Sequence, residues 1–344
     1  MSHKFIINGR FLVHRITGVE RYAREIVSEL DKLVPADMEI SMAIPPEVAE
    51  IPSFKNIHVV KIGWLHNRMW EHISFPWYVR QQKAISLNLC NVAPLTDPGI
   101  VCIHDVKIKA RPQDFSKKFI FWYKVLFWNE TKHAKAILTD SEFSKREILK
   151  YYPRSSQKIT VIPLAWQHYD RIGYDEGTLI KYGLQKGQYF YSMCSLEPNK
   201  NFRWIAEEAR NHPDQIFAVA GSINQKVFSD GLGFERPKNM KLLGYVTDEE
   251  AKTLSRDCLA FLFPTFYEGF GIPPLEAMAS GCHNIVVSDT EVMHEVFGNS
   301  VSYVNPEDPS VEIPIRTLNT DITLNKYSWE KSAELLLKVL KNIV

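Results

Sequence analysis

The chain has 344 residues, of which 45% are hydrophobic and 24% are charged. This balance is typical of a globular protein and excludes a disordered or collagen-like chain. The 41 Lys and Arg residues and 40 Asp and Glu residues leave a formal charge of +1, so the chain has no overall basic field to hold nucleic acid. The length exceeds the roughly 100–200 residues of a usual domain and predicts two domains.

Short β-rich runs alternate with helical patterns along the chain, which predicts βαβ units, parallel sheets and an α/β fold. The clearest helix is expected at 18–33, where apolar residues recur at i, i+3 and i+4. Strands are expected in the first half at 5–7, 39–43, 57–61, 84–87, 100–103, 136–139 and 160–162.

Residues 166–187 lose this rhythm and carry four glycines, which indicates a passage between domains. Thr247 and Glu250 have the spacing of a capping box that opens a helix to about residue 257. A last helix is expected after Ser328, a residue suited to the N-cap. Strands are expected in the second half at 189–193, 215–220, 240–243, 259–263, 284–287 and 301–304.

The cysteines and the N-terminus point to a protein of the cell interior. The 5 cysteines, at positions 90, 102, 194, 258 and 282, form no C-x-x-C pair. Their spacing predicts neither a zinc site nor a disulfide framework and suits a reducing compartment. The N-terminus has no secretory stretch, and no run of 18 uncharged apolar residues occurs. We therefore expect a soluble cytoplasmic protein.

The most informative segment is residues 261–281, FLFPTFYEGFGIPPLEAMASG. A buried strand leads through Gly269-Phe270-Gly271 into a helix that two prolines open. The N–H groups of such a helix N-terminus commonly bind phosphate. Glu268 and Glu276 flank the turn, and their carboxylates could accept hydrogen bonds from sugar or ribose hydroxyls. On residue chemistry alone, Glu276 could instead complement the helix dipole and Glu268 could be a solvated loop residue.

This segment closely resembles the signature of glycosyltransferase family 4, a family of retaining enzymes with the GT-B fold. The resemblance extends over nearly the whole chain and continues through Glu291–Glu295 and the NPEDP turn at 305–309. Its other motifs follow in the expected order: ITGVERYAREIV (16–27), VCIHD (101–105), LTDSEFSKREI (138–148), VIPLA (161–165), SLEPNKN (195–201), LLGYVTDEEAKTL (242–254) and YSWEKSA (327–333).

The resemblance implies two Rossmann-like domains that face a cleft. Residues 1–165, completed by a C-terminal helix at 328–344 that crosses back, would form the acceptor-binding domain. Residues 166–327 would bind the nucleotide sugar. Glu268 would contact the hydroxyls of the donor sugar and Glu276 the nucleotide ribose, while N–H groups of Gly269, Phe270 and Gly271 would line the diphosphate and sugar.

Lys200 lies in a turn just before a helix, where the resemblance implies contact with the diphosphate. Without the resemblance, an exposed lysine would be the ordinary reading. Family members usually carry Pro-Arg-Lys-Asn here, whereas this chain has Pro198-Asn-Lys-Asn201. Asn199 thus stands where a cation is expected, and Arg203, one helical turn on, is a candidate substitute.

Two further candidates belong to the first domain. His104, next to Asp105, follows the strand at 100–103, and the resemblance implies that it reaches the donor sugar and phosphate; a structural histidine is the alternative. Gly18 begins the first helix in a loop that would bring N–H groups close to the leaving phosphate or the acceptor. Arg21 is a weaker candidate, with a surface ion pair as its alternative.

Residues 116–133, SKKFIFWYKVLFWNETKH, are basic and aromatic. Such a helix could lie in a membrane interface, where the aromatic rings reach headgroup depth. It could equally be buried on its sheet or stack on sugar rings. No Asp-x-Asp motif occurs, so the sequence predicts neither a metal held by that motif nor a cofactor. Positive groups of the protein would then stabilise the departing diphosphate.

These features predict a metal-independent, retaining hexosyltransferase. It would move a mannosyl or rhamnosyl unit from a nucleoside diphosphate sugar to a saccharide or lipid-linked saccharide during synthesis of bacterial surface polysaccharide, meaning O-antigen, capsule or lipopolysaccharide. Two alternatives remain open at this point. One is a sugar-nucleotide epimerase or phosphorylase with the same fold, and the other is a catalytically weak scaffold subunit of a polysaccharide assembly complex.

Overall fold

The computed structural model describes residues 3–155, 158–193, 197–221, 236–309 and 312–343. The chain divides into two compact units. Residues 1–164 together with 328–344 form unit 1, and residues 165–327 form unit 2. This division lies within one residue of the boundary expected from the sequence, and the last helix belongs to the first unit.

Unit 1 contains a seven-stranded parallel sheet with the order β3-β2-β1-β4-β5-β6-β7. Helices follow most of its strands, as parallel connections require. β6 is buried along its whole length, which accounts for its unbroken apolar run. The strands are β1 (His3–Asn8), β2 (Met38–Ile44), β3 (His58–Lys61), β4 (Ile85–Asn88), β5 (Ile100–Cys102), β6 (Ala136–Thr139) and β7 (Ile159–Val161).

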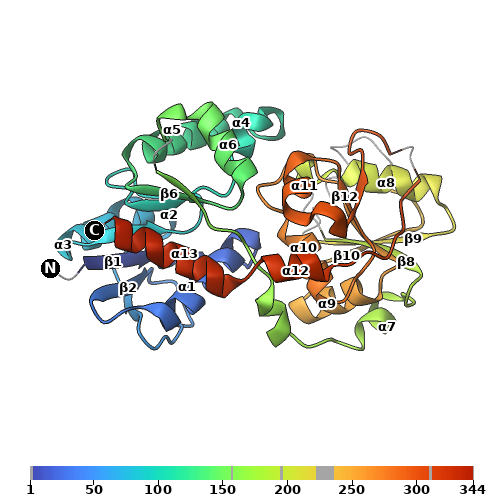
Figure 1. Ribbon diagram of the computed structural model, residues 1–344, viewed down its shortest axis with the longest axis horizontal. Coiled ribbons are helices and arrows are strands. Elements are labelled where there is room, and N and C mark those ends of the chain that lie inside the picture. Colours follow the sequence, from blue (N-terminus) through green and yellow to red (C-terminus); the bar gives the residue numbers. More distant parts are fainter. Residues whose placement is uncertain (1–2, 156–157, 194–196, 222–235, 310–311, 344) are drawn as a thin grey trace. The chain divides into compact units, whose positions relative to one another are not determined.

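The helices of unit 1 include the predicted helix 18–33, which is α1, and the C-terminal helix α13. α13 lies against α1 (Figure 1), and the Tyr22 and Trp329 rings meet edge to face with their centroids 6.1 Å apart. The helices are α1 (Gly18–Leu33), α2 (Asn67–Met69), α3 (Phe75–Gln81), α4 (Lys107–Ala110), α5 (Lys117–His133), α6 (Glu142–Tyr151) and α13 (Trp329–Asn342). Shorter turns are η1 (Gly9–Val13), the π-helical η2 (Trp70–Ser74), η3 (Pro112–Asp114) and η4 (Pro153–Ser155).

Unit 2 contains a six-stranded parallel sheet with the order β10-β9-β8-β11-β12-β13. Its strands are β8 (Tyr189–Met193), β9 (Ile216–Ala220), β10 (Met240–Gly244), β11 (Ala260–Phe263), β12 (Ile285–Ser288) and β13 (Ser302–Val304). Its helices are α7 (Thr178–Tyr182), α8 (Phe202–Asn211), α9 (Asp248–Asp257), α10 (Ile272–Ala279), α11 (Glu291–Phe297) and α12 (Asp321–Lys326). Its shorter turns are η5 (Gln167–Arg171), η6 (Pro198–Lys200) and η8 (Gly298–Ser300).

The strands expected from the sequence are all present, with ends that shift by two residues or fewer. The capping box of α9 is confirmed, because Thr247 and Glu250 exchange hydrogen bonds between side chain and backbone. Residues 166–187 are not merely a passage between domains. They include η5 and α7, and α7 packs against α9 within unit 2.

Two cysteines that are far apart in the sequence meet in unit 2. The sulfur atoms of Cys258 and Cys282 lie 3.7 Å apart, and both residues are free thiols. Sequence spacing gave no sign of this contact. Cys194 lies outside the described residues.

Each sheet has one point at which the strand order reverses direction. In unit 1 it falls between β1 and β4, and in unit 2 between β8 and β11. At such a point the loops leave the carboxyl ends of two neighbouring strands toward opposite faces, which opens a crevice where ligands of α/β sheets usually bind. The strand order therefore predicts that functional residues lie in the loops after β1, β4, β8 and β11.

Candidate functional site

Lys200 and Glu268 meet at the reversal point of the unit 2 sheet. Lys200 ends η6, which follows β8 along the chain, and Glu268 lies in the loop after β11. The Lys200 Nζ donates to Glu268 Oε1 at 2.8 Å, and the two side chains are 19% and 14% exposed. The ammonium also lies 5.6 Å from the centre of the Phe263 ring. The structure thus brings together a cation and a carboxylate 68 residues apart, in a partly exposed position that a ligand can reach.

Two asparagines hold the Lys200 turn against the loop after β11. The Asn199 side chain donates an N–H to the Tyr267 carbonyl oxygen at 3.3 Å. The backbone carbonyl of Asn199 accepts a hydrogen bond from the Phe266 N–H at 2.8 Å. Asn201 adopts a left-handed conformation at the N-cap of α8 and donates to the Pro264 and Pro306 carbonyls. These bonds join the Pro198–Asn201 turn to the 261–281 segment, so the two sequence motifs lie next to each other.

Asn199 is buried, with 2% of its surface exposed, and its side chain is turned toward the protein. Arg203, the candidate substitute for the usual arginine, lies on the outer face of α8. Its side chain is 77% exposed and its Nε donates to Glu207 at 2.7 Å, one helical turn further on. The structure does not bring Arg203 to the Lys200–Glu268 pair, so Lys200 is the cation that this turn presents.

The N-terminus of α10 follows Glu268 directly. Gly271 is its N-cap with a φ of +99°, a conformation that favours glycine, and a Cβ there would lie 3.0 Å from the Met293 side chain. Pro273 and Pro274 carry no N–H, so two of the four N–H groups usually unpaired at a helix start are absent. An anion at this helix end would therefore depend on N–H groups from Gly269 to Ile272, the segment singled out from the sequence.

Glu276 lies inside α10 and is buried, and it contacts a residue that the sequence did not suggest. Its Oε1 lies 2.8 Å from His168 Nε2, in the η5 turn. Both side chains are almost fully buried. The two residues are 108 positions apart, and His168 falls in the segment expected to link the domains. No local pattern could have indicated it.

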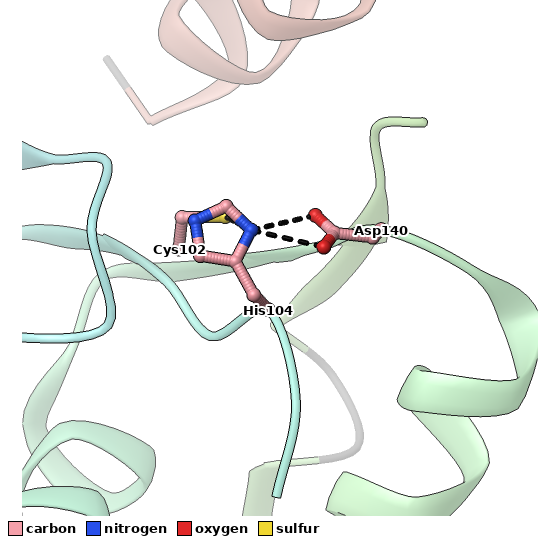
Figure 2. A group of neighbouring side chains, drawn as sticks. All are labelled: Cys102, His104 and Asp140. Carbon is pink, nitrogen blue, oxygen red and sulfur yellow. Dashed lines mark hydrogen bonds and ion pairs between the residues drawn. The ribbon is translucent and has the colours of Figure 1, made fainter. Parts of the chain in front are cut away.

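In unit 1, His104 lies at the end of β5 as expected but is enclosed by protein. Its Nδ1 lies 2.9 Å from both carboxylate oxygens of Asp140 (Figure 2). Its Nε2 lies 2.9 Å from the Leu89 carbonyl oxygen. Because each ring nitrogen faces an acceptor, the imidazolium form, which donates from both, satisfies the site best. Burial alone would lower the pKa of His104, but the Asp140 carboxylate outweighs burial and holds that pKa well above its ordinary value.

Cys102, His104 and Asp140 offer ligand atoms within 4.8 Å of one another. Such side chains can bind metal ions. Here, however, both His104 nitrogens are engaged in hydrogen bonds, and a metal ligand would need one of them free. The arrangement is that of a buried ion pair. His104 also holds the loop after β4, since its backbone N–H donates to the Asn91 side chain at 2.7 Å.

Gly18 is the first residue of α1, behind a Thr17–Glu20 capping box. Asp105 accepts from the backbone N–H of Lys107, the first residue of α4, at 2.9 Å. Arg21 lies on α1, where its backbone N–H donates to Thr17. These residues lie where the sequence predicted, and their contacts are those of a helix start.

The aromatic helix expected at 116–133 is α5, and its side chains divide among three environments. Leu126 and Phe127 are buried in the core. Trp122 and Tyr123 line a cavity within unit 1. Phe121 and Trp128 are 70% and 52% exposed. Among the described residues, no helix combines the length and apolarity that crossing a bilayer requires.

Comparisons with known proteins identify the family and the fold. Residues 181–343 match the family described as Glycosyl transferases group 1. The O-antigen chain mannosyltransferase RfbU of Salmonella typhimurium is 27% identical over 312 residues, covering 85% of this chain and 84% of that protein. An O-antigen chain mannosyltransferase B of Escherichia coli is 28% identical over 222 residues, covering 61% of this chain and 58% of that protein.

Among solved structures, a sucrose-phosphate synthase from Thermosynechococcus elongatus superimposes with a TM-score of 0.66 at 11% identity. The match covers 99% of this chain and 94% of that one. It extends over both units, including the C-terminal helix that returns to unit 1. The GT-B fold implied by the sequence resemblance is thereby confirmed, and residues 181–343 carry the domain of the group 1, or family 4, glycosyltransferases.

Proposed function

We propose that this glycosyltransferase moves a mannosyl unit from a nucleoside diphosphate mannose, such as GDP-mannose, to a hydroxyl of a saccharide acceptor in surface polysaccharide synthesis. The family implies a nucleotide-sugar donor and a saccharide acceptor. The names of the two O-antigen mannosyltransferases favour mannose over rhamnose. The observation that carries the proposal is the Lys200–Glu268 pair at the reversal point of the unit 2 sheet.

In the proposed reaction, the difficult event is cleavage of the anomeric C–O bond while negative charge gathers on the diphosphate. The Lys200 ammonium would stabilise that charge, together with N–H groups at the start of α10. Glu268 holds the ammonium in place and would accept from a donor-sugar hydroxyl through its second oxygen. Glu276, positioned by His168, would accept from the ribose. Arg203 has no part in the proposed site because it is exposed and paired with Glu207.

We further propose that the configuration at the anomeric carbon is retained. The family resemblance supports retention of the anomeric configuration. It does not assign any protein side chain as the nucleophile. A leaving phosphate oxygen could take the acceptor proton on the same face of the sugar. His104 enters the proposal as a positioning residue, because its ring nitrogens hold Asp140 and the loop after β4.

The donor is tested by thermal unfolding of the full chain in the presence of GDP-mannose, dTDP-rhamnose, UDP-glucose and the corresponding nucleotides. A ligand that binds only the folded protein at 100 times its Kd adds about 2.7 kcal/mol, a readily measured rise in midpoint. We expect GDP-mannose to give the largest rise. A larger rise with dTDP-rhamnose or UDP-glucose would contradict the mannose assignment, and isomerisation of a nucleotide sugar without acceptor would contradict transfer altogether.

The exposed face of α5 supports a further part of the proposal, contact with an anionic membrane that carries a lipid-linked acceptor. Basic and aromatic residues alternate on this face at intervals of three or four, so they lie on one side of the helix. Lys132 Nζ lies 4.7 Å from the centre of the Trp128 ring. Aromatic rings that reach the depth of the lipid headgroups, with lysines between them, are typical of a helix that lies in the membrane interface. The residues of this stripe are Lys117, Phe121, Lys124, Trp128 and Lys132.

We expect the double variant Phe121→Ala with Trp128→Ala to lose about tenfold or more of its affinity for anionic vesicles, because two ring insertions are removed. Cosedimentation with phosphatidylcholine vesicles, with and without phosphatidylglycerol, measures this. Ile180→Ala, which removes an 86% exposed side chain of unit 2, is the control. Equal binding by the double variant and the control, or equal binding to neutral and anionic vesicles, would refute the membrane contact.

A further inference from the structure

Cys258 and Cys282 form a pair of thiols in unit 2, and their sulfur atoms lie 3.7 Å apart. Cys258 follows α9 directly and precedes β11, whereas Cys282 lies between α10 and β12. The pair therefore lies at the amino ends of two neighbouring strands. Lys200 and Glu268 follow the carboxyl ends of strands in the same sheet. The proposed transfer reaction thus makes no use of the two thiols.

The register of the sheet places the two cysteines across from each other. Phe261 of β11 pairs with Ile285 of β12, and Cys258 and Cys282 have the same separation of 24 positions. Neighbouring strands lie about 4.7–4.9 Å apart, and a disulfide usually joins residues whose Cα atoms are about 4.4–6.8 Å apart. A disulfide at these positions therefore fits the spacing that the two strands impose.

Hydrogen bonds beside the two cysteines hold this spacing. The Phe261 N–H donates to the Asn284 backbone carbonyl, and the Asn284 side chain donates to the Leu259 carbonyl, each at 2.9 Å. The Cys282 N–H donates to the Ala277 carbonyl in α10 at 3.1 Å. Because the backbone is held on both strands, the disulfide bond length of about 2.05 Å is to be reached by movement of the side chains.

The environments of the two thiols differ. A hydrogen bond from the Cys258 thiol lowers the pKa of the Cys282 thiol, although burial opposes this effect. Burial raises the pKa of the Cys258 thiol. Cys258 is partly exposed as a residue, and Cys282 is buried between the exposed residues Gly281 and His283. A Cβ on Gly281 would meet open space. The pair thus lies just beneath the surface, at a depth that suits a small oxidant rather than a bulky one.

We propose that Cys258 and Cys282 are a modification site at which a hydroperoxide forms a reversible disulfide. The thiolate is the nucleophilic form of cysteine, so the Cys282 sulfur attacks one oxygen of hydrogen peroxide. The O–O bond breaks, one water leaves and a sulfenic acid forms. The Cys258 sulfur then attacks the Cys282 sulfur, so the S–S bond forms, the S–O bond breaks and a second water leaves. The two thiols lose two electrons and two protons, and the peroxide is reduced to water.

The disulfide stabilises the part of unit 2 that carries the candidate site. It closes a loop that contains residues 259–281, and hence Glu268, Gly271 and Glu276. A cross-link that closes a loop removes conformations from the unfolded chain and so favours the folded state. Because the cross-link lies at the amino ends of the strands, it leaves the loops at their carboxyl ends open to a ligand.

The test compares the full chain before and after treatment with hydrogen peroxide. Chymotrypsin cuts after aromatic residues, several of which lie between the two cysteines, and digestion without reductant should yield linked peptides that carry Cys258 and Cys282. The thermal midpoint should rise by about 5 °C or more, and dithiothreitol should reverse both changes. Cys258→Ala and Cys282→Ala should each abolish the rise. Cys90→Ala, which removes a partly exposed thiol of unit 1, should keep it.

Other outcomes would overturn the inference. These are a sulfinic acid at either cysteine without linked peptides, two thiols that stay free after the treatment, a cross-link to any other cysteine, or linked peptides with an unchanged or lower midpoint. Peptide mapping and the midpoint of the parent chain decide the result even where an alanine variant is unstable. Neither readout requires a donor or an acceptor, so the outcome is independent of the proposed transferase function.

Discussion

Lys200→Ala is expected to lower the turnover number by about 100- to 1,000-fold. A preorganised donor aimed at developing negative charge contributes about 3–4 kcal/mol to the transition state, and Lys200 is the cation that the structure places beside Glu268 at the reversal point of its sheet. The loss should fall mainly on kcat, because charge on the diphosphate grows as the glycosidic bond breaks. Initial rates of mannosyl transfer, with donor and acceptor varied separately, measure the effect.

A matched control is available one helical turn away. Arg203→Ala removes a cation that is 77% exposed and paired with Glu207, and we expect less than a threefold change in turnover. A fully active Lys200→Ala would remove Lys200 from the mechanism. A large loss in Arg203→Ala alone would instead show that the arginine takes over the role of the residue that Asn199 replaces. Far-ultraviolet circular dichroism of each variant checks that the fold is intact.

A large pH effect on stability is expected from Glu130. This carboxyl group on α5 is fully buried, and one of its oxygens accepts from the Ala93 N–H at 2.9 Å. Burial raises the pKa of Glu130 from 4.5 to about 8, partly opposed by the Ala93 hydrogen bond and increased by the charge of Glu71. The folded protein therefore keeps a proton on Glu130 at neutral pH, where the unfolded chain has lost it.

The proton that the folded protein holds on Glu130 makes its stability depend on pH. Between about pH 4.5 and 8 the folded state binds more protons than the unfolded state, so the contribution of Glu130 to stability falls as the pH rises. At 1.36 kcal/mol per pH unit, the whole interval corresponds to about 5 kcal/mol, and the step from pH 6 to 8 to about 2 kcal/mol. Glu130→Gln, uncharged at every pH, should lose this slope.

Urea unfolding at pH 6, 7 and 8 compares the parent with Glu130→Gln. Glu334→Gln, which alters an exposed carboxyl group of α13 in the same unit, should keep the slope of the parent. Parallel losses of stability in the parent and Glu130→Gln over this range would show that Glu130 ionises freely in the folded protein.

The sequence predicted the fold well because its signals are local. Each strand of a buried parallel sheet is a short apolar run between turn residues, and each helix carries its own periodicity and caps. The box of Thr247 and Glu250 marks the start of α9 directly. The family motifs then identified Lys200 and Glu268, which the structure brings to 2.8 Å of each other.

What the sequence missed depends on contacts between distant positions. His168 reaches Glu276 from 108 residues away. The contact between Cys258 and Cys282 depends on the register of β11 and β12, which has no sequence signature. His104 was identified by its motif, but its environment was not, because only the fold shows that Asp140 and Leu89 take both ring nitrogens.

The assignment of the last helix to unit 1 has a consequence for how the protein is made. Because residues 328–344 complete unit 1, unit 2 is a continuous insertion whose whole sequence leaves the ribosome before that last part of unit 1. Unit 2 can therefore finish folding during translation, whereas the surface of α1 that receives Trp329 stays uncovered until the helix that carries Trp329 has been synthesised. Loss of residues 328–344 would thus damage the unit whose other strands and helices are encoded first.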